Sequence, residues 1–304
     1  MAANSVASAL LKVVKQTAYD GSRKYAFHPP DGPHFEAAFF QVVGRERPNI
    51  ACVSTQLGCA VGCIFCATAS GPFYRDLTAE EILWQVDTLA SDQGLPRILS
   101  EGFEVSFMGM GEPLANLRNV LQAIAGISQR YPQITRVSVS TAGPAHRIDR
   151  LTEAMPAAIP IHLQVSLHAT RDIERRALVP RAPGMIADLL VAADRYHQLT
   201  GDHVCLNYIL LEGRNDSAAD AAWLAAIDPT VFYVKLSALN HVPDLPLRLK
   251  RKSREATARF ADKVSARGLT VKIFEGDGLD VQASCGQLAA TPRLVAISGR
   301  SRGW

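Results

Sequence analysis

The chain contains no apolar run of membrane length and no charged segment followed by an apolar leader. A helix that spans a bilayer needs about 20 consecutive apolar residues, so we expect a soluble, cytoplasmic protein with no membrane partner. No low-complexity tract and no short sequence repeat occur. Apolar residues make up 48% of the 304 residues, which is enough to bury the core of one large domain or two smaller ones.

The chain also has few cysteines and a small net charge. Six cysteines in 304 residues do not make a disulfide scaffold. In a cytosolic chain, clustered cysteines more often bind metal or take part in chemistry. The net charge is +3 at pH 7, which permits an anionic partner but does not require one.

Short β-branched runs alternate with longer segments of helical period along most of the chain. This alternation predicts a parallel sheet with crossover helices, in the α/β class. About six repeats fit a partial (βα)6 barrel better than a complete eight-fold barrel. The predicted strands lie near 51–55, 104–109, 136–140, 161–168, 203–211, 231–238 and 270–274, and predicted helices include 79–89, 117–129 and 183–198.

The first 50 residues differ from this pattern and are predicted to form an extension of the barrel. Residues 1–18 are expected to form one short helix with an apolar face, and residues 19–50 to form two strands around a turn. The barrel itself is predicted to span residues 51–304, with a C-terminal loop that carries Cys285.

Four of the six cysteines lie in the stretch CVSTQLGCAVGCIFCATA, residues 52–69, and the last three are spaced C-x3-C-x2-C as Cys59, Cys63 and Cys66. A structural zinc site usually takes four ligands as two separated pairs, which fits this spacing poorly. A four-iron cluster held by three thiolates has one open iron, which can bind nitrogen and oxygen atoms of a small molecule. Packed, reduced cysteines or a zinc loop are the alternatives that these residues leave open.

Polar motifs follow several of the predicted strands. In such folds chemistry gathers at the C-terminal ends of strands, so we expect these motifs to meet at one mouth. Each also has an ordinary interpretation as a turn, a helix cap or a packed side chain. The motifs are FMGMGEPLAN with Gly111 and Glu112, SVSTAGP with Ser140, QVSLHAT with Ser166 and His168, and LSALNHVP with Asn240.

Three thiols remain outside the spaced set. Cys285 lies in the polar, glycine-flanked loop GDGLDVQASCGQL, which makes it a candidate nucleophile. Cys52 lies on the strand that leads into the cysteine cluster. Cys205 lies within an apolar strand pattern, and we assign it to packing.

Taken together, these motifs resemble those of the dual-cysteine (class A) radical S-adenosylmethionine (SAM) methyltransferases, which methylate carbon 2 or carbon 8 of adenine in ribosomal RNA. The matching segments run in the family's order from residue 19 to about 289. The resemblance implies a partial barrel of the radical-SAM type, a [4Fe-4S] cluster on Cys59, Cys63 and Cys66, and SAM bound at the open iron. It implies that these residues contact SAM: Gly111, Glu112, Ser140, Ser166, Leu167, His168 and Asn240.

The resemblance also implies a role for the two remaining site thiols. One SAM methylates Cys285, and a radical from a second SAM removes a hydrogen atom from that methyl group. The resulting methylene radical adds to an sp² carbon of the substrate, and Cys52 then releases the product by forming a disulfide with Cys285. Glu36 matches a carboxylate that handles protons, although its spacing to Cys52 is about three residues longer than expected. A flavodoxin or ferredoxin type reductase is the implied electron donor.

The sequence departs from the family at its start. Only about 18 residues precede the first matching strand, so we expect the family's N-terminal helical domain to be missing. The basic run 248–259 either contacts phosphate or is a solvated helix face. We therefore slightly favour a small-molecule or peptide substrate from a biosynthetic pathway. The alternatives are an RNA adenine C2/C8 methyltransferase, with a nucleotide-like or RNA substrate, and a non-catalytic metal-binding regulator that does not cleave SAM.

Overall fold

A curved sheet of parallel strands forms the centre of the protein. The computed structural model describes residues 12–29, 32–41, 49–92, 94, 102–155, 159–181, 184–242 and 249–289. Each parallel strand pairs with the next along the chain, as the α/β prediction requires. The strands are β4 (Asn49–Cys52), β7 (Phe103–Phe107), β8 (Arg136–Thr141), β9 (Ile161–Ser166), β10 (Val204–Leu210), β11 (Phe232–Ala238) and β12 (Val271–Phe274).

Three antiparallel strands extend the sheet beyond β4: β1 (Lys12–Thr17), β2 (Arg23–His28) and β3 (Phe35–Phe40). Strands β2 and β3 are the two expected between residues 19 and 50. The predicted N-terminal helix is wrong over residues 12–17, and its first eleven residues lie outside the described ranges. β-branched Val13 and Val14 favour a strand, and they pair with Phe27 and Ala26 of β2.

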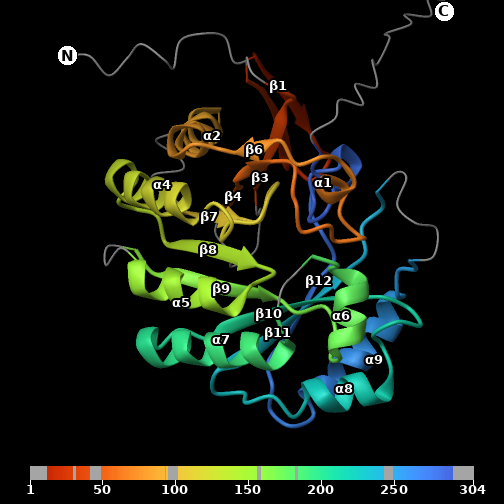
Figure 1. Cartoon of the computed structure of the whole chain (residues 1–304). Helices are drawn as coiled ribbons and strands as arrows, with labels where there is room; N and C mark the ends of the chain where they lie inside the picture. Colours follow the sequence, from red (N-terminus) through yellow and green to blue (C-terminus); the bar gives the residue numbers. More distant parts are fainter. Residues whose placement is uncertain are drawn as a thin grey trace, which may run out of the picture.

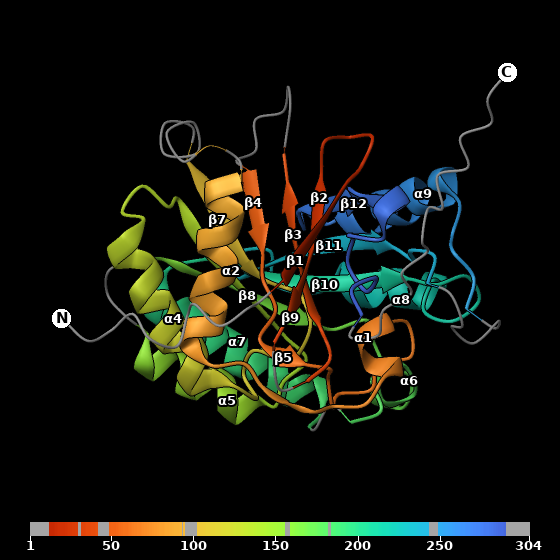
Figure 2. The same ribbon diagram turned by 90° about the horizontal axis from the view of Figure 1, so that it is seen from above.

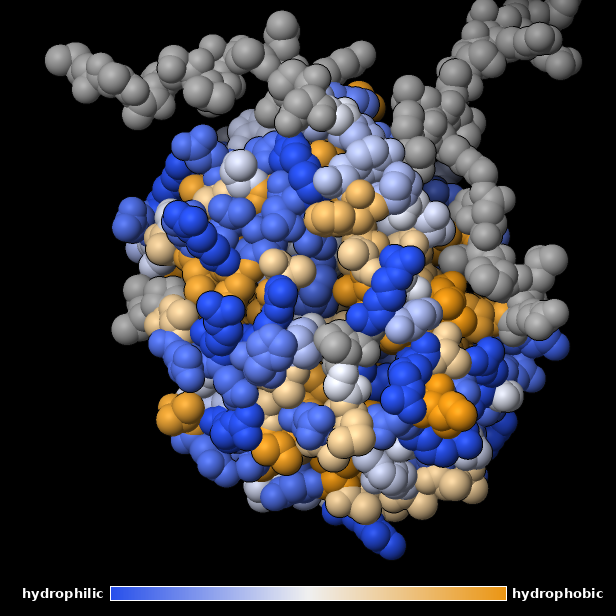
Figure 3. Space-filling view, in the orientation of Figure 1, coloured by the Kyte–Doolittle hydropathy of each residue, from blue (hydrophilic) through white to orange (hydrophobic). Residues whose placement is uncertain are grey.

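Crossover helices cover the outer side of the parallel strands. Figure 1 shows α2, α4, α5 and α7 in a row along the strands that they connect, and Figure 2 shows the sheet from above. Polar residues cover most of the face seen in Figure 3. Among the described helices, none combines the length and apolarity needed to cross a bilayer. The helices are α1 (Ala67–Ser70), α2 (Ala79–Asp92), α4 (Leu117–Arg130), α5 (Ala145–Ala154), α6 (Asp172–Leu178), α7 (Ile186–Thr200), α8 (Ala218–Leu224) and α9 (Arg254–Ser265).

The two faces of the central strands differ in chemistry because successive side chains point to opposite sides of a sheet. On β9, for example, Leu163 and Val165 are buried in the main core, whereas Gln164 and Ser166 lie on the opposite face. The outward face packs against the helices and holds the sheet in place. The inward face of β8–β11 carries polar groups: Ser138, Ser140, His162, Gln164, Ser166, Cys205, Asn207, Tyr233, Lys235 and Ser237.

Helix α2 begins with a reciprocal cap that connects it to the loop after the cysteine cluster. The Glu81 amide donates to Thr78 Oγ1 at 3.2 Å, and the Thr78 amide donates to Glu81 Oε2 at 2.8 Å. This pair is the capping box that the sequence LTAEE suggests, and it satisfies two donors at the helix start.

We expect Thr78→Ala to lower the free energy of unfolding by about 1 kcal/mol, because the Glu81 amide loses its acceptor. Thr78→Ser keeps the hydroxyl and is the matched control, for which we expect a change of only a few tenths of that size. Urea unfolding followed by circular dichroism measures both. Equal losses in the two variants would show that the hydroxyl does not act as the cap.

Candidate active site

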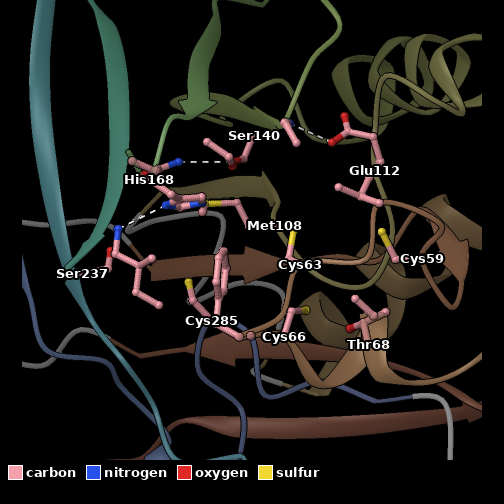
Figure 4. Close-up of a pocket in the computed structure, with 18 of the residues that line it drawn as sticks. Cys59, Cys63, Cys66, Thr68, Met108, Glu112, Ser140, His168, Ser237 and Cys285 are labelled. Atoms are coloured by element: carbon pink, nitrogen blue, oxygen red, sulfur yellow. Dashed lines mark hydrogen bonds between the residues drawn. The ribbon is translucent and has the colours of Figure 1, made fainter. Parts of the chain in front are cut away.

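One cavity lies at the C-terminal ends of the parallel strands, and Figure 4 shows cysteine, serine, histidine and glutamate side chains around it. The ends of β8–β11, the loops after β4 and β7, and the C-terminal loop all contribute to its wall. It brings together most of the predicted site residues. Those that line it are Cys59, Cys63, Cys66, Gly111, Glu112, Ser140, Ser166, His168, Asn240 and Cys285.

The loop that carries the three spaced cysteines follows a path that requires glycine. Gly58 has φ +77°, and a Cβ on it would lie 2.0 Å from the Pro72 carbonyl oxygen. The far end of the loop is fixed by the Ile64 amide, which donates to the Leu178 carbonyl at 3.0 Å. These constraints fix the backbone path of the loop, and its thiols face the cavity (Figure 4).

The three spaced thiols suit a metal cluster in their chemistry. Burial raises the pKa of Cys59 to about 12 and raises the pKa of Cys63 well above its usual value. A buried thiol of this kind ionises when a metal ion replaces its proton. The Arg175 guanidinium lies near Cys63 and lowers the pKa of that thiol, so the site holds a buried cation beside the thiolates.

Glu112 is buried in the cavity wall and is held in one orientation. Its Oε1 accepts from Thr141 Oγ1 at 2.7 Å, and its Oε2 accepts from the Ala142 amide at 2.8 Å. Burial raises the pKa of Glu112, and these hydrogen bonds oppose the rise. Gly111 precedes it with φ +102°, where a Cβ would lie 2.6 Å from Gln56 Cβ. Glycine at this position therefore lets the backbone pass close to Gln56 and place Glu112 at the cavity wall.

His168 follows β9 in an unusual backbone conformation, with φ +59°. Its Nδ1 accepts a hydrogen bond from the Ile209 amide at 3.1 Å, so the proton of the neutral ring is on Nε2. Burial, together with the positive charges of Arg175 and Lys235, lowers the pKa of His168 to about 3. The ring is therefore a neutral donor at the cavity wall throughout the physiological pH range.

Ser140 and Ser166 stand opposite each other on β8 and β9, with their hydroxyl oxygens 3.5 Å apart. The structure adds Asn207 on β10, whose Nδ2 donates to Ser140 Oγ at 3.2 Å. Cys205 Sγ donates to Asn207 Oδ1 at 3.7 Å, so this buried thiol also orients a cavity residue besides filling the core. Sequence analysis missed Asn207, although a lone asparagine within the apolar strand VCLNYIL was a signal.

Arg175 on α6 is a second residue that sequence analysis missed. The residue is only 2% exposed, and its Nη2 donates to the carbonyls of Ala142 at 2.6 Å and Ser166 at 3.2 Å. It therefore joins the ends of β8 and β9 beneath the cavity. The only sign of this residue in the sequence was the segment RRALVP, which did not distinguish the buried arginine from its exposed neighbour Arg176.

Hydrogen bonds at Cys285 and at the next residue attach the C-terminal loop to the cavity. Asn240 Nδ2 donates to the Cys285 carbonyl at 2.9 Å, and the Ala67 amide donates to the Gly286 carbonyl at 2.7 Å. Within the part of the chain that the structure describes, the buried Oδ1 of Asn240 has no hydrogen-bond partner. Asn240 thus orients the loop and keeps one acceptor for a ligand.

Cys52 lies behind the C-terminal loop. It is 7% exposed at the end of β4 and packs against Ala38 and Ala283. Burial, together with the nearby Cys285, raises the pKa of Cys52 to about 12. Both thiols are free in this structure. The two residues are therefore neighbours, although 233 positions of the sequence separate them.

Besides Cys52, two further predicted site residues lie outside the cavity wall. Leu167 is fully buried in the main core, so only its backbone is near the site. Glu36 on β3 forms an ion pair with Lys24 at 3.2 Å and accepts from the Ala289 amide at 2.9 Å. Its carboxylate supports the end of the C-terminal loop from outside the cavity.

Comparison with known proteins agrees with this geometry. A model of the radical SAM superfamily matches residues 53–223. The chain is 41% identical over 288 residues to a probable dual-specificity RNA methyltransferase RlmN 1 of Opitutus terrae, covering 91% of this chain and 78% of that protein. A probable dual-specificity RNA methyltransferase RlmN of Thermus thermophilus is 38% identical, with 92% and 78% covered.

A solved structure shows the same fold. The crystal structure of a radical SAM methyltransferase from Sphaerobacter thermophilus superposes with a TM-score of 0.82 at 35% identity, covering 92% of this chain and 82% of that one. The chain therefore belongs to the radical SAM superfamily and, within it, to the methyltransferase family of the RlmN relatives. It is a radical SAM methyltransferase that uses a [4Fe-4S] cluster, SAM and a reductant, and not a non-catalytic regulator.

The neutral state of His168 predicts a loss of stability in acid. The unfolded chain takes up this proton below about pH 6.5, whereas the folded protein does so only near pH 3. Stability from this residue is therefore lost as the pH falls from 6.5 towards 3. Between pH 7.5 and 5 we expect the loss to be about 2 kcal/mol larger in the cluster-free wild type than in His168→Asn.

Urea unfolding at the two pH values measures this difference. Asparagine is the matched replacement because it tolerates the left-handed backbone and its side-chain oxygen can accept from the Ile209 amide. The same pH dependence in both proteins would mean that His168 is not held neutral in the fold.

Proposed function

We propose that this enzyme methylates an sp² carbon of adenine in RNA, at carbon 2 or carbon 8, through Cys285 and Cys52. The observation that carries the proposal is the arrangement of thiols: Cys285 shares a cavity with Cys59, Cys63 and Cys66, while Cys52 lies behind its loop. The RlmN relatives are named as RNA methyltransferases, and the chain covers 78% of the Opitutus terrae protein. This favours RNA over the small-molecule or peptide substrate that the sequence led us to prefer.

In this proposal, the chain's own residues bind and orient the two cofactors. Cys59, Cys63 and Cys66 hold the [4Fe-4S] cluster through their thiolates. Glu112 accepts hydrogen bonds from the amino group of SAM, because its fixed carboxylate lines the cavity. Contacts from Gly111, Ser140, Ser166, His168, Asn240 and the Leu167 backbone complete the SAM site. When bound, the cluster and SAM supply a deoxyadenosyl radical, and another SAM supplies the methyl group.

Cys285 and Cys52 then act in sequence. Cys285 loses its thiol proton and accepts a methyl group. Once a hydrogen atom has been removed from this group, its carbon bonds to the adenine carbon. The adenine carbon then gives up its own hydrogen as a proton, and the unpaired electron of the adduct returns to the electron carrier. Cys52 attacks the Cys285 sulfur, so a sulfur–sulfur bond forms as the carbon–sulfur bond breaks. The released methylene carbon takes up a proton, and the disulfide must be reduced before the next cycle.

The remaining assignments follow from this chemistry. We propose that a flavodoxin or ferredoxin type reductase supplies the electron and that the enzyme works in the cytoplasm, where RNA is present. Proton handling by Glu36 stays a prediction. Its ion pair with Lys24 and its bond to the Ala289 amide support a role in placing the loop that carries Cys285.

Two cysteine variants test the proposal. With protein prepared without oxygen, we expect peptide mass spectrometry to find a methyl group on Cys285 in the wild type and none in Cys285→Ala. We expect Cys52→Ala to accumulate a covalent RNA adduct, because nothing displaces the carbon from sulfur. Nucleoside analysis of the treated RNA measures the methyladenosine that the wild type releases.

Cys205→Ser is the matched control, since it removes a thiol but keeps the donor to Asn207. It should form methyladenosine and no adduct. Cleavage of SAM without methylation of Cys285 would contradict the cysteine mechanism. Methylated Cys285 with no RNA product would contradict the RNA substrate and leave the mechanism standing.

A further inference from the structure

The inner face of the last two strands of the sheet carries a small surface that the proposed chemistry does not use. We call it the β11–β12 face; it consists of Tyr233, Lys235, Lys272 and Phe274. Lys235 and Lys272 are direct register partners on these parallel strands. Lys235 Nζ lies 6.0 Å from the centre of the Phe274 ring, and Lys272 Nζ lies 4.7 Å from the centre of the Tyr233 ring. Each lysine thus lies near an aromatic ring of the neighbouring strand.

The two positive charges of this face have no acidic partner among the residues that the structure describes. Among the described residues, neither ammonium forms an ion pair, and Lys235 Nζ donates instead to the neutral Gln164 Oε1 at 2.8 Å. The carboxylate of Asp202 is bonded to His162 at 2.7 Å. Like charges placed directly opposite each other on neighbouring strands destabilise a sheet. Such a pair is favourable once an anion binds between the ammonium groups.

The β11–β12 face is accessible and continuous with the active site. Lys272 is exposed and Lys235 half-buried, and β12 is the edge strand of the sheet. Two residues after Lys235, Ser237 lines the cavity. Phe274 leads directly into the loop that carries Cys285. A ligand that reaches Cys285 from the sheet edge therefore crosses this face.

We propose that the β11–β12 face binds the phosphate backbone of the single-stranded RNA next to the target adenine. This inference rests on the proposed function and names the surface that receives the substrate. Proteins that bind single strands combine a positively charged path for the backbone with aromatic side chains. Neighbouring strands lie about 4.8 Å apart, so both lysines are within reach of the same stretch of RNA backbone. A neutral small molecule would leave both charges unused.

The test measures how RNA affinity depends on salt. The probe is a fluorescent RNA stem–loop with an adenine in its single-stranded loop, titrated without oxygen with the cluster-loaded enzyme and SAM. Each phosphate neutralised on a single strand contributes about 0.7 to the slope of log affinity against log salt. We expect Lys272→Gln to reduce that slope by about 0.7, because one phosphate contact is lost. We also expect this variant to bind the RNA more weakly at low salt.

Two further variants make the result specific. Lys272→Arg keeps the charge and should restore the wild-type slope, which a merely misfolded variant would not explain. Lys263→Gln removes the same charge from an exposed position on α9 and should leave the slope unchanged.

An unchanged slope in Lys272→Gln, with RNA still methylated by the wild type, would overturn the β11–β12 face alone. A wild type that methylates no RNA would overturn the proposed function and this inference together.

Discussion

The backbone hydrogen bond from Ala67 to Gly286 connects the two halves of the active site. It joins the residue after Cys66 to the residue after Cys285, so a cluster ligand and the predicted nucleophile have a fixed relation. Asn240 holds the Cys285 carbonyl from the end of β11, and Thr68 Oγ1 bonds the Leu288 carbonyl at 2.6 Å. A radical formed at the cluster is useful only if the atom it attacks is held nearby, and these bonds provide that proximity.

Electrostatics around the cavity follow from burial. The neutral His168 and the buried cation Arg175 lie beside thiols that favour their protonated state in the absence of metal. Binding an anionic cluster and the carboxylate of SAM adds negative charge to this region, and Arg175 balances part of it. The protein therefore places one buried cation near the cluster ligands and two lysines on the last strands of the sheet, with neutral serine and asparagine side chains in the cavity.

Much of the site was predictable because parallel strands bring their C-terminal ends to one edge. Glu112, Ser140, Ser166 and Asn240 each follow or end a strand, so locating the strands located the cavity. Leu167 was placed in the site by resemblance, but alternation along the chain points its side chain into the core. Arg175 escaped notice because it acts through hydrogen bonds to the carbonyls of distant strands, which no local pattern encodes. Asn207 had a local signal as the lone polar residue of VCLNYIL, but its bond to Ser140 joins positions 67 apart in the sequence.

The N-terminal error has a similar cause. The apolar residues between positions 9 and 14 suggested one helix face, but β-branched Val13 and Val14 favour a strand, which forms by pairing with β2. The preference for a small-molecule substrate came from an expected missing domain and a low net charge. A total of +3 conceals local excess, since Lys235 and Lys272 gather uncompensated charge at one place.

The contact between the first hairpin and the last loop has a consequence for the order of folding. The Gly278 amide donates to Asp20 Oδ2 at 2.7 Å across 258 positions of sequence, and the Tyr19 amide donates to Asp280 at 3.1 Å. Contacts of such long range form late, because loop closure must come first. During synthesis on the ribosome, the cysteine loop emerges long before the loop that covers it. The loop that carries Cys285 can therefore take its place only after the cysteine loop is present.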